Sequence, residues 1–428
     1  MTAIALVVAS MIGTGVFTTS GFSLAGLGNR EFVMLAWCVA GLLAMAGALS
    51  YGALARRIPH SGGEYTFLSY TIHPLVGFLA GWVSLLAGFT GPIAIAALAL
   101  QAYLAPTPEG GPEPLPWIGT GAILLAALIH GIRLGPGVVA QNFAVLAKLV
   151  LIVCFVVLGA IWLPGSAAGS SEAPASFDLG GFAVAVMWIS FSYSGWNAAV
   201  YVASEVKDPE RNLNRSLWIA TALVTVLYLA LNAVFVYSAP IADLAGKKEV
   251  GAIAAEAIGG PVLRSAVSAL VALALFTSIS AMVMIGPRVY SRMAEDGLFP
   301  RWLRFRGQVP YASILFQAAL AVVVVWMTTL RDLIEYLSFT LGVSAAVTVI
   351  GLISLRIREG AERVPVPGFP WLPGIFVVTV LGSAGFMVYR ADSGAYIGIL
   401  TIAVGVPLYF IMRWIGRRRE GTNSLTRS

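Results

Sequence analysis

The chain has 428 residues, of which 58% are hydrophobic and only 11% are charged, and its mean hydropathy is +0.87. This balance excludes a soluble protein of this size and predicts an all-α polytopic membrane protein without a sizeable extramembrane domain. The formal charge of +6 is interpreted by position along the chain and does not indicate a nucleic-acid partner. Cys38 and Cys154 fall inside apolar segments and predict neither a disulfide nor a metal site.

Twelve apolar runs are long enough to cross a bilayer. We place these transmembrane helices at residues 2–25, 31–55, 72–104, 116–132, 136–163, 180–203, 216–240, 258–293, 312–329, 332–355, 372–390 and 394–415. The first run continues without a small-residue cleavage signal, so we expect a retained span and not a signal peptide.

Lysine and arginine are distributed unequally between the two sides of this topology. Nineteen of the 26 fall in segments that are cytoplasmic if the N-terminus is inside, six fall outside, and Lys148 lies within a span. This asymmetry predicts that both termini are cytoplasmic, including the basic tail 417–428. We expect an integral protein of the plasma (cell inner) membrane.

Glycine and threonine interrupt the first run near its middle, in Ser10-Met11-Ile12-Gly13-Thr14-Gly15-Val16-Phe17. Glycine permits non-helical backbone, whose freed N–H and C=O groups need partners in lipid. Alternatively, the glycines only allow close helix packing. The sixth run has a second interruption, Phe191-Ser192-Tyr193-Ser194-Gly195-Trp196-Asn197. Two interrupted helices in corresponding positions favour an inverted-repeat transporter with its site at the membrane midplane.

Lys148 lies well inside the fifth run, with apolar residues on both sides. A buried ammonium needs an oxygen partner or a cavity, which favours a functional role over snorkelling to the surface. In the eighth run, Ser278 and Ser280 offer hydroxyls that could face Lys148 or bond back to their own helix.

Four motifs together resemble the amino acid–polyamine–organocation permeases, and the L-amino acid transporter-like branch in particular. They are the two interruptions, Glu205-Val206-Lys207-Asp208-Pro209-Glu210-Arg211-Asn212, and Gly286-Pro287-Arg288-Val289-Tyr290. The resemblance implies a LeuT-type fold with helices 1 and 6 broken at mid-membrane. Residues 1–163 (spans one to five) and 180–356 (spans six to ten) would then form the inverted repeat, followed by two flanking spans in 372–416.

The resemblance also implies that an amino acid zwitterion binds between the two interruptions. N–H groups at Gly13, Thr14 and Gly15 suit an α-carboxylate. Carbonyl groups suit an α-ammonium, at Met11, Phe191, Ser192 and Ser194.

Four neighbouring residues complete this expected site. Tyr193 and Trp196 would form the side-chain pocket or a gate, and the small Gly195 would leave room for the substrate. Asn197 stands where proton-coupled relatives carry a glutamate.

By the same resemblance, the Lys148 ammonium replaces a sodium ion and props the first span against the eighth, at Ser278 and Ser280. This implies sodium independence. We find no carboxylate at mid-membrane depth, because the acidic residues considered fall near span ends or in loops, namely Glu31, Glu64, Asp178, Glu205, Glu256, Glu295, Asp332 and Glu335. Their position argues against proton symport and against a dicationic substrate.

We therefore predict a secondary active transporter for L-amino acids, with neutral ones expected, that works by alternating access as a sodium-independent exchanger or facilitator. A proton-coupled symporter that uses Lys148 is the alternative, and a non-transporting amino acid receptor of the same fold is a remote one. No catalytic motif, metal site or cofactor is predicted, and we expect no enzyme. The expected partners are the lipid bilayer and a small amino acid, without an accessory subunit, in a monomer or weak homodimer.

Overall fold

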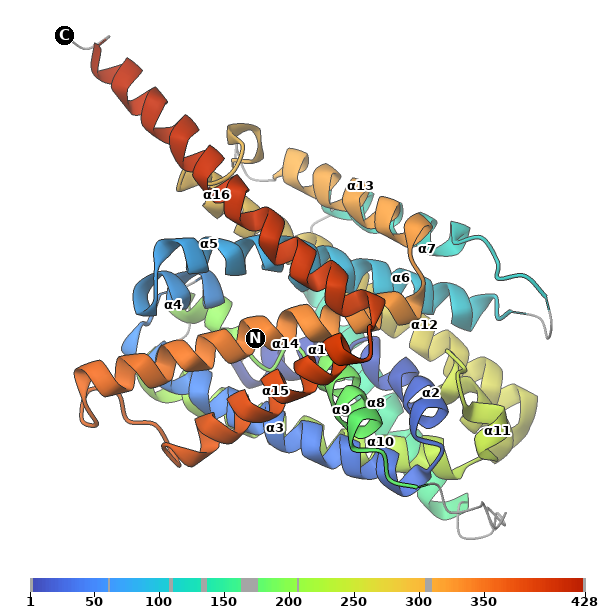
Figure 1. Cartoon of the computed structure of the whole chain (residues 1–428). Coiled ribbons are helices and arrows are strands. Elements are labelled where there is room, and N and C mark those ends of the chain that lie inside the picture. The colour runs from blue at the N-terminus through green and yellow to red at the C-terminus, as the bar shows by residue number, and fades with distance from the viewer. Residues whose placement is uncertain are drawn as a thin grey trace.

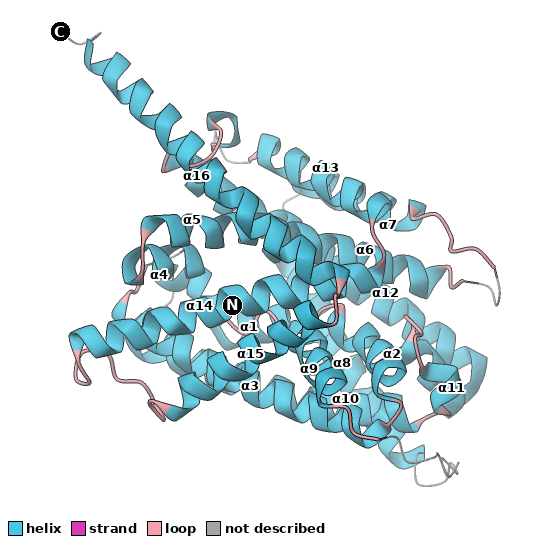
Figure 2. Cartoon of the chain, viewed as in Figure 1, coloured by secondary structure: helices cyan, strands magenta, loops and turns pink. Residues whose placement is uncertain are grey.

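The computed structural model describes residues 3–60, 62–107, 111–131, 137–162, 176–205, 208–304 and 310–425. Within these ranges every regular element is a helix (Figure 2). The helices of the first part of the chain are α1 (Ala3–Met11), α2 (Gly15–Leu27), α3 (Arg30–Arg57), α4 (Gly63–Thr71), α5 (Pro74–Val83), the π-helical η1 (Ser84–Thr90), α6 (Gly91–Leu104), α7 (Trp117–Gly131) and α8 (Gly137–Trp162).

The second part of the chain, after residues 163–175, is also helical where it is described. Its helices are α9 (Leu179–Ser192), the 3-10 helix η3 (Ala198–Glu205), α10 (Pro209–Tyr237), α11 (Ile241–Leu244), α12 (Val250–Glu295), η4 (Arg301–Leu303), α13 (Tyr311–Met327), α14 (Leu330–Glu359), α15 (Trp371–Tyr389) and α16 (Ser393–Leu425).

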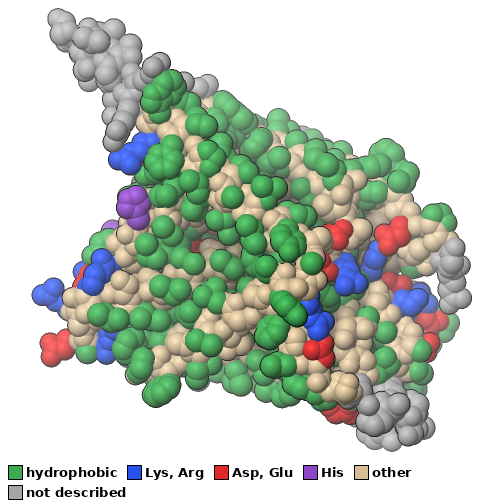
Figure 3. Space-filling view, in the orientation of Figure 1, with side chains coloured by type: hydrophobic (Ala, Val, Ile, Leu, Met, Phe, Trp, Pro, Cys, Tyr) green, Lys and Arg blue, Asp and Glu red, His purple; other side chains and the backbone are tan. Residues whose placement is uncertain are grey.

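The protein is an integral membrane protein by the length and hydropathy of its helices. Seven described segments are long and apolar enough to cross a membrane, at Arg30–Arg57, Pro74–Leu104, Asn212–Tyr237, Val250–Pro287, Leu330–Glu359, Trp371–Tyr389 and Ser393–Ile415. Four shorter apolar helices accompany them, at Trp117–Gly131, Leu146–Trp162, Leu179–Ser192 and Tyr311–Met327. Figure 3 shows charged side chains mainly toward two opposite ends of one face, with hydrophobic side chains between them.

Local sequence explains where several of these helices begin and bend. Asn29 accepts a hydrogen bond from the Phe32 amide (2.9 Å) and caps α3, and Thr329 forms a capping box with Asp332 at the start of α14. The long α12 is kinked at Gly259 and Gly260, directly before Pro261, whose ring cannot be accommodated in a straight helix.

The longer helical segments lie at the expected runs, and three short helices, α4, α11 and η4, fall between them. The sequence assigns the residues of α4 to the loop after the second run. This loop starts with turn-forming residues, and the helix that follows them has only nine residues, so the sequence pattern did not indicate it. Helix α10 also begins at Pro209 and α12 at Val250, both earlier than expected, because polar residues extend these helices beyond their apolar runs.

The elements pack as pairs of long helices around a central group of shorter ones (Figure 1). Helix α3 packs along α10, α6 packs along α12, and α14 contacts both α15 and α16. A buried polar network joins α2, α3 and α10, because the Ser20 hydroxyl donates to Asn232 Oδ1 (2.5 Å) and accepts from the Trp37 indole (3.0 Å). This network fixes the position of α2 relative to both long helices.

At the start of α9, outside the apolar spans, an ion pair makes the stability of the fold depend on pH. Asp178 accepts a hydrogen bond from the Gly180 amide (3.0 Å) and forms an ion pair with Arg390, which lowers the pKa of the Asp178 carboxyl. A pKa depressed in the folded state stabilises the fold above the unfolded value, and this contribution is lost as the pH falls through the folded value. We expect the melting temperature to fall below about pH 4, and to fall less in Asp178→Asn.

Thermal unfolding of the solubilised protein between neutral and acidic pH would measure this difference. Asp243→Asn, in the exposed part of α11, is the matched control and should keep the wild-type pH profile. Identical acid sensitivity in wild type and Asp178→Asn would contradict the role of this pair.

Candidate functional site

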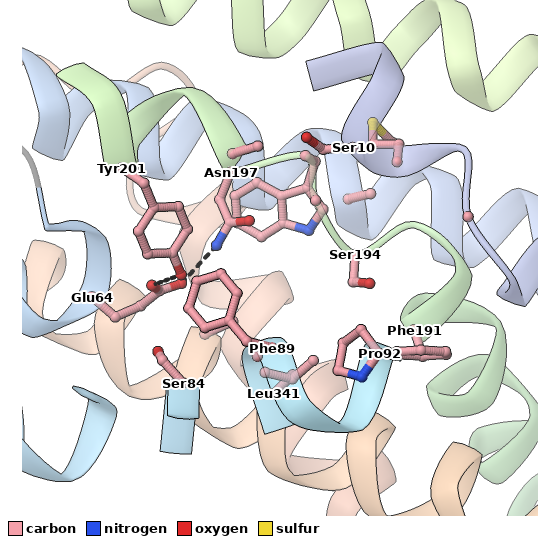
Figure 4. A pocket seen from close by; sticks show the side chains of 18 of the residues that line it. Ser10, Glu64, Ser84, Phe89, Pro92, Phe191, Ser194, Asn197, Tyr201 and Leu341 are labelled. Atoms are coloured by element: carbon pink, nitrogen blue, oxygen red, sulfur yellow. Dashed lines mark hydrogen bonds between the residues drawn. The ribbon is translucent and has the colours of Figure 1, made fainter. Parts of the chain in front are cut away.

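A cavity of about 1690 Å³ lies where two non-helical stretches of the chain meet. The first stretch separates α1 from α2, and the second separates α9 from η3. Residues of α3, α4, η1, α6, α8, α10, α12, α14 and α15 also line the cavity. Figure 4 shows Ser10 of α1 close to the turn that carries Ser194 and Asn197.

The first stretch places free backbone donors on the cavity wall. Gly13, Thr14 and Gly15 line the cavity, and Gly13 donates to the Met11 carbonyl (2.8 Å) in a tight turn. The first N–H groups of α2 have no acceptor in their own helix, and the helix dipole adds positive potential there. This end of α2 is therefore suited to an anionic group.

The second stretch ends α9 in a turn over residues 193–197. The Phe191 carbonyl accepts from the Ser194 amide (2.9 Å), whereas the carbonyls of Ser192 and Ser194 accept no backbone hydrogen bond from the described turn. Ser192 and Ser194 both line the cavity. Carbonyl groups at a helix C-terminus carry partial negative charge and suit a cationic group.

Glycine is required where the two stretches touch. A Cβ atom on Gly195 would lie 2.6 Å from the Ser10 carbonyl oxygen, and Gly195 has a φ of +101°. A Cβ atom on Gly15 would lie 2.5 Å from the Ser192 hydroxyl oxygen. The small size of Gly195 therefore allows close packing against α1, and Gly195 also lines the cavity.

Two further residues of the expected site have partners within the protein. The Met11 carbonyl already accepts from the Tyr228 hydroxyl (2.6 Å) and the Gly13 amide, so both of its lone pairs are occupied. The Tyr193 side chain is fully buried away from the cavity, where its hydroxyl donates to the Trp37 carbonyl (3.2 Å). Trp196 does line the cavity, with its ring 4.7 Å from that of Tyr51.

Lys148 of α8 fastens the end of α1. Its side chain is 6% exposed, and its ammonium donates to the carbonyls of Ile12 (2.6 Å) and Ala9 (3.3 Å). These carbonyls belong to the C-terminal end of α1, where a cation is favoured by the helix dipole. The ammonium thus satisfies backbone groups that the interruption of the helix leaves free.

Ser278 and Ser280 of the eighth run form hydrogen bonds with partners other than Lys148. The Ser278 hydroxyl donates to the Ala274 carbonyl of its own helix (3.0 Å), which is the common behaviour of serine in a helix. The Ser280 hydroxyl is 2.8 Å from Nε2 of His130 on α7. Both hydroxyls are thus bonded to groups other than Lys148.

A carboxylate that the sequence analysis assigned to a loop lines the cavity. Glu64 of α4 is 6% exposed and accepts hydrogen bonds from Tyr51 (3.1 Å), Asn197 (2.6 Å) and Tyr201 (Figure 4). These neutral donors come from α3, the turn after α9, and η3. Its expected position near a span end or in a loop did not predict that Glu64 would line the cavity.

The sequence did contain a signal for this placement. Gly63 precedes Glu64 with a φ of +55°, and a Cβ atom on it would lie 2.3 Å from the Tyr201 ring. A glycine pair directly before a helix can mark close approach of another segment. Which segment approaches is a property of the tertiary fold.

Comparison with known proteins agrees with this geometry. A family model described as "Amino acid permease" matches residues 1–416. The chain belongs to the amino acid permease family. This permease is therefore a transporter of amino acids.

The permease is similar over nearly its whole length to curated transporters. It is 26% identical over 421 residues to the serine/threonine exchanger SteT of Bacillus subtilis (strain 168), covering 96% of this chain and 95% of that protein. It is 27% identical over 430 residues to the human large neutral amino acids transporter small subunit 2, covering 96% and 79%. It is 25% identical over 421 residues to the human cystine/glutamate transporter, covering 95% and 83%.

Packing at the interruptions of the permease is tested by two glycine substitutions. We expect Gly195→Ala to destabilise the protein by ~1–3 kcal/mol, because it combines a positive φ with a steric clash at Ser10. Gly13→Ala is the matched control, because its Cβ atom would meet only the Met11 oxygen, at 3.9 Å. Thermal unfolding of both variants measures the difference, and equal melting temperatures would contradict the required contact.

Proposed function

We propose that this permease is a sodium-independent exchanger or facilitator of neutral L-amino acids. The observation that carries the proposal is that two helix interruptions meet at one cavity, with the first held by a lysine. Neutral substrates are also favoured by two relatives whose names specify serine and threonine, and large neutral amino acids.

We infer that the chain crosses the membrane twelve times. In this arrangement α1 with α2, and α9 with η3, each form one crossing that is broken near the midplane. The seven long segments and the other shorter apolar helices then supply the remaining crossings. The proposed inverted repeat relates residues 1–163 to 180–356, with 372–416 as two flanking crossings.

The substrate zwitterion would bind between the two interruptions. Its α-carboxylate would accept from backbone N–H groups at Thr14 and Gly15, and the Gly13 N–H would first have to leave the Met11 carbonyl. Its α-ammonium would donate to the carbonyls of Ser192 and Ser194, which are not used within the described turn. The substrate side chain would extend toward Trp196 and Phe191 on the same wall.

Lys148 would act as a permanent substitute for a bound cation. Its ammonium occupies the carbonyls of Ala9 and Ile12, which are the kind of oxygen ligands that a sodium ion would need. A covalently attached charge needs no ion gradient to bind. Sodium independence follows from this role.

The proposed orientation places the cavity mouth on the cytoplasmic side. His60 and Asp296 line the cavity, and both belong to segments that the positive-inside rule assigns to the cytoplasm. This conformation would then be inward-facing, in a plasma-membrane protein with cytoplasmic termini. We expect no accessory subunit and no enzymatic activity.

A specific observation supports proton-coupled symport as a second candidate. Glu64 is a buried carboxylate on the cavity wall whose described hydrogen-bond donors are all neutral. Lys148 is the other buried ionisable group of this cavity.

Counterflow into proteoliposomes loaded with a neutral amino acid mixture tests the main proposal. We expect saturable uptake that requires internal amino acid and is unaffected by replacing sodium with choline. Lys148→Ala should reduce this uptake about tenfold or more, because the end of α1 loses a charged hydrogen-bond donor. Lys248→Ala is the control, since Lys248 pairs with the exposed Glu113 far from the cavity.

The outcomes of this experiment have separate meanings. Absence of uptake by a correctly folded protein would contradict transport and leave an amino acid receptor. Normal uptake by Lys148→Ala would keep transport and remove the functional role of the lysine.

A proton gradient distinguishes exchange from symport. We expect that an inward proton gradient does not drive accumulation into empty liposomes, because the proposed cycle translocates no net proton. The control is a valinomycin-clamped membrane potential without a pH difference. Gradient-driven accumulation that disappears in Glu64→Gln would establish symport instead.

A further inference from the structure

A second, smaller cavity lies at the opposite end of α14 from α4. Arg358 near the end of α14 donates to the Thr71 carbonyl of α4 (2.6 Å), whereas Arg331 at its start lines the second cavity. This cavity has a volume of about 110 Å³, and its described lining residues differ from those of the large cavity. We call it the outer cavity, because the positive-inside rule assigns Arg331 and Arg390 to the outside.

Three buried polar atoms of the outer cavity have no described hydrogen-bond partner. They are the Ser23 hydroxyl oxygen, the Trp188 indole nitrogen and the Asp392 Oδ2 atom. Ser23 is only 1% exposed and Trp188 only 6%. Burying a polar atom without a hydrogen-bond partner is unfavourable, so three such atoms in one small cavity indicate a polar occupant.

The charges around the outer cavity are mixed. The Arg331 guanidinium lies 5.5 Å from the centre of the Trp188 ring and donates to Glu335 (3.0 Å). Arg390 forms an ion pair with Asp178. Burial and the neighbouring Glu335 carboxylate raise the pKa of the Asp392 carboxyl, whereas Arg331 and Arg390 lower it by a smaller amount.

The size and chemistry of the outer cavity fit a zwitterion. Since a water molecule takes roughly 30 Å³, the space holds a few waters or one ammonium, α-carbon and carboxylate group. The Trp188 N–H and the Ser23 O–H can donate to a carboxylate, and Asp392 Oδ2 can accept from an ammonium. An anion alone would face Asp392, and a cation alone would face the arginines.

We propose that the outer cavity binds the head group of an α-amino acid, separately from the cavity between the interruptions. This proposal rests on the proposed transport function. Gly15 and Ser23 are about 12 Å apart along α2, and Ser192 and Trp188 are one turn apart on α9. The same two helices therefore line both cavities, so an amino acid in the outer cavity contacts the helices whose movement would admit it.

Equilibrium binding to the purified full-length protein in nanodiscs tests this site, with radiolabelled L-serine and L-leucine as probes. Gly13→Val serves to block the central cavity, because the added side chain would point into open space and not into the packed core. We expect wild type to bind at both sites and Gly13→Val to retain only the outer one. In the Gly13→Val background, Trp188→Phe should weaken binding roughly tenfold or more.

Two further variants control for indirect effects. Trp82→Phe also removes an indole N–H, one that donates to the Thr401 carbonyl (2.9 Å) outside the outer cavity, and it should leave outer binding unchanged. Asp392→Asn keeps the side-chain shape, so its loss of binding would identify the ammonium partner independently of whether Trp188→Phe folds.

The results separate this proposal from the proposed function. If wild type binds and exchanges amino acids but Gly13→Val binds none, the outer cavity holds only water and the proposal is overturned, while transport stands. If Asp392→Asn retains binding that chloride displaces, the cavity is an anion site and the zwitterion assignment is overturned. If wild type neither binds nor exchanges amino acids, both proposals fail.

Discussion

The structure depends on how it satisfies the backbone groups that two non-helical stretches, between α1 and α2 and between α9 and η3, leave free among apolar helices. Carbonyl groups at the end of α1 are taken by Lys148 from α8 and by Tyr228 from α10. The two interruptions also touch directly, at Gly195 with Ser10 and at Gly15 with Ser192. Without these partners each buried group would cost several kcal/mol, and continuous helices would be favoured.

This arrangement joins the two halves of the chain at the site. The Thr19 hydroxyl of α2 is 3.0 Å from the Ser192 hydroxyl of α9, and Tyr228 reaches α1 from the second half. Movement of α1 relative to α8 or α10 would therefore break identifiable hydrogen bonds. Alternating access, as proposed, would exchange these contacts for others in an outward-facing form.

Lys148 and Glu64 are two buried charges with different kinds of partners. Lys148 is held by carbonyl groups, which makes it part of the support of α1. Glu64 is held by side-chain hydroxyl and amide donors from three elements, which joins α4 to the turn after α9. The Lys148 contacts hold the stretch between α1 and α2, and the Glu64 contacts hold the turn between α9 and η3.

Sequence by itself determined the helical class, the positions of the apolar segments and both interruptions, because hydropathy and glycine act locally along the chain. Gly13, Thr14, Gly15, Ser192 and Ser194, which the resemblance to the permeases implied for the site, all line the cavity. Tertiary structure alone decided that Tyr193 faces the core, that Ser280 meets His130, and that Glu64 reaches Asn197. These outcomes depend on the rotation of each helix about its axis and on contacts between distant residues, neither of which a local pattern encodes.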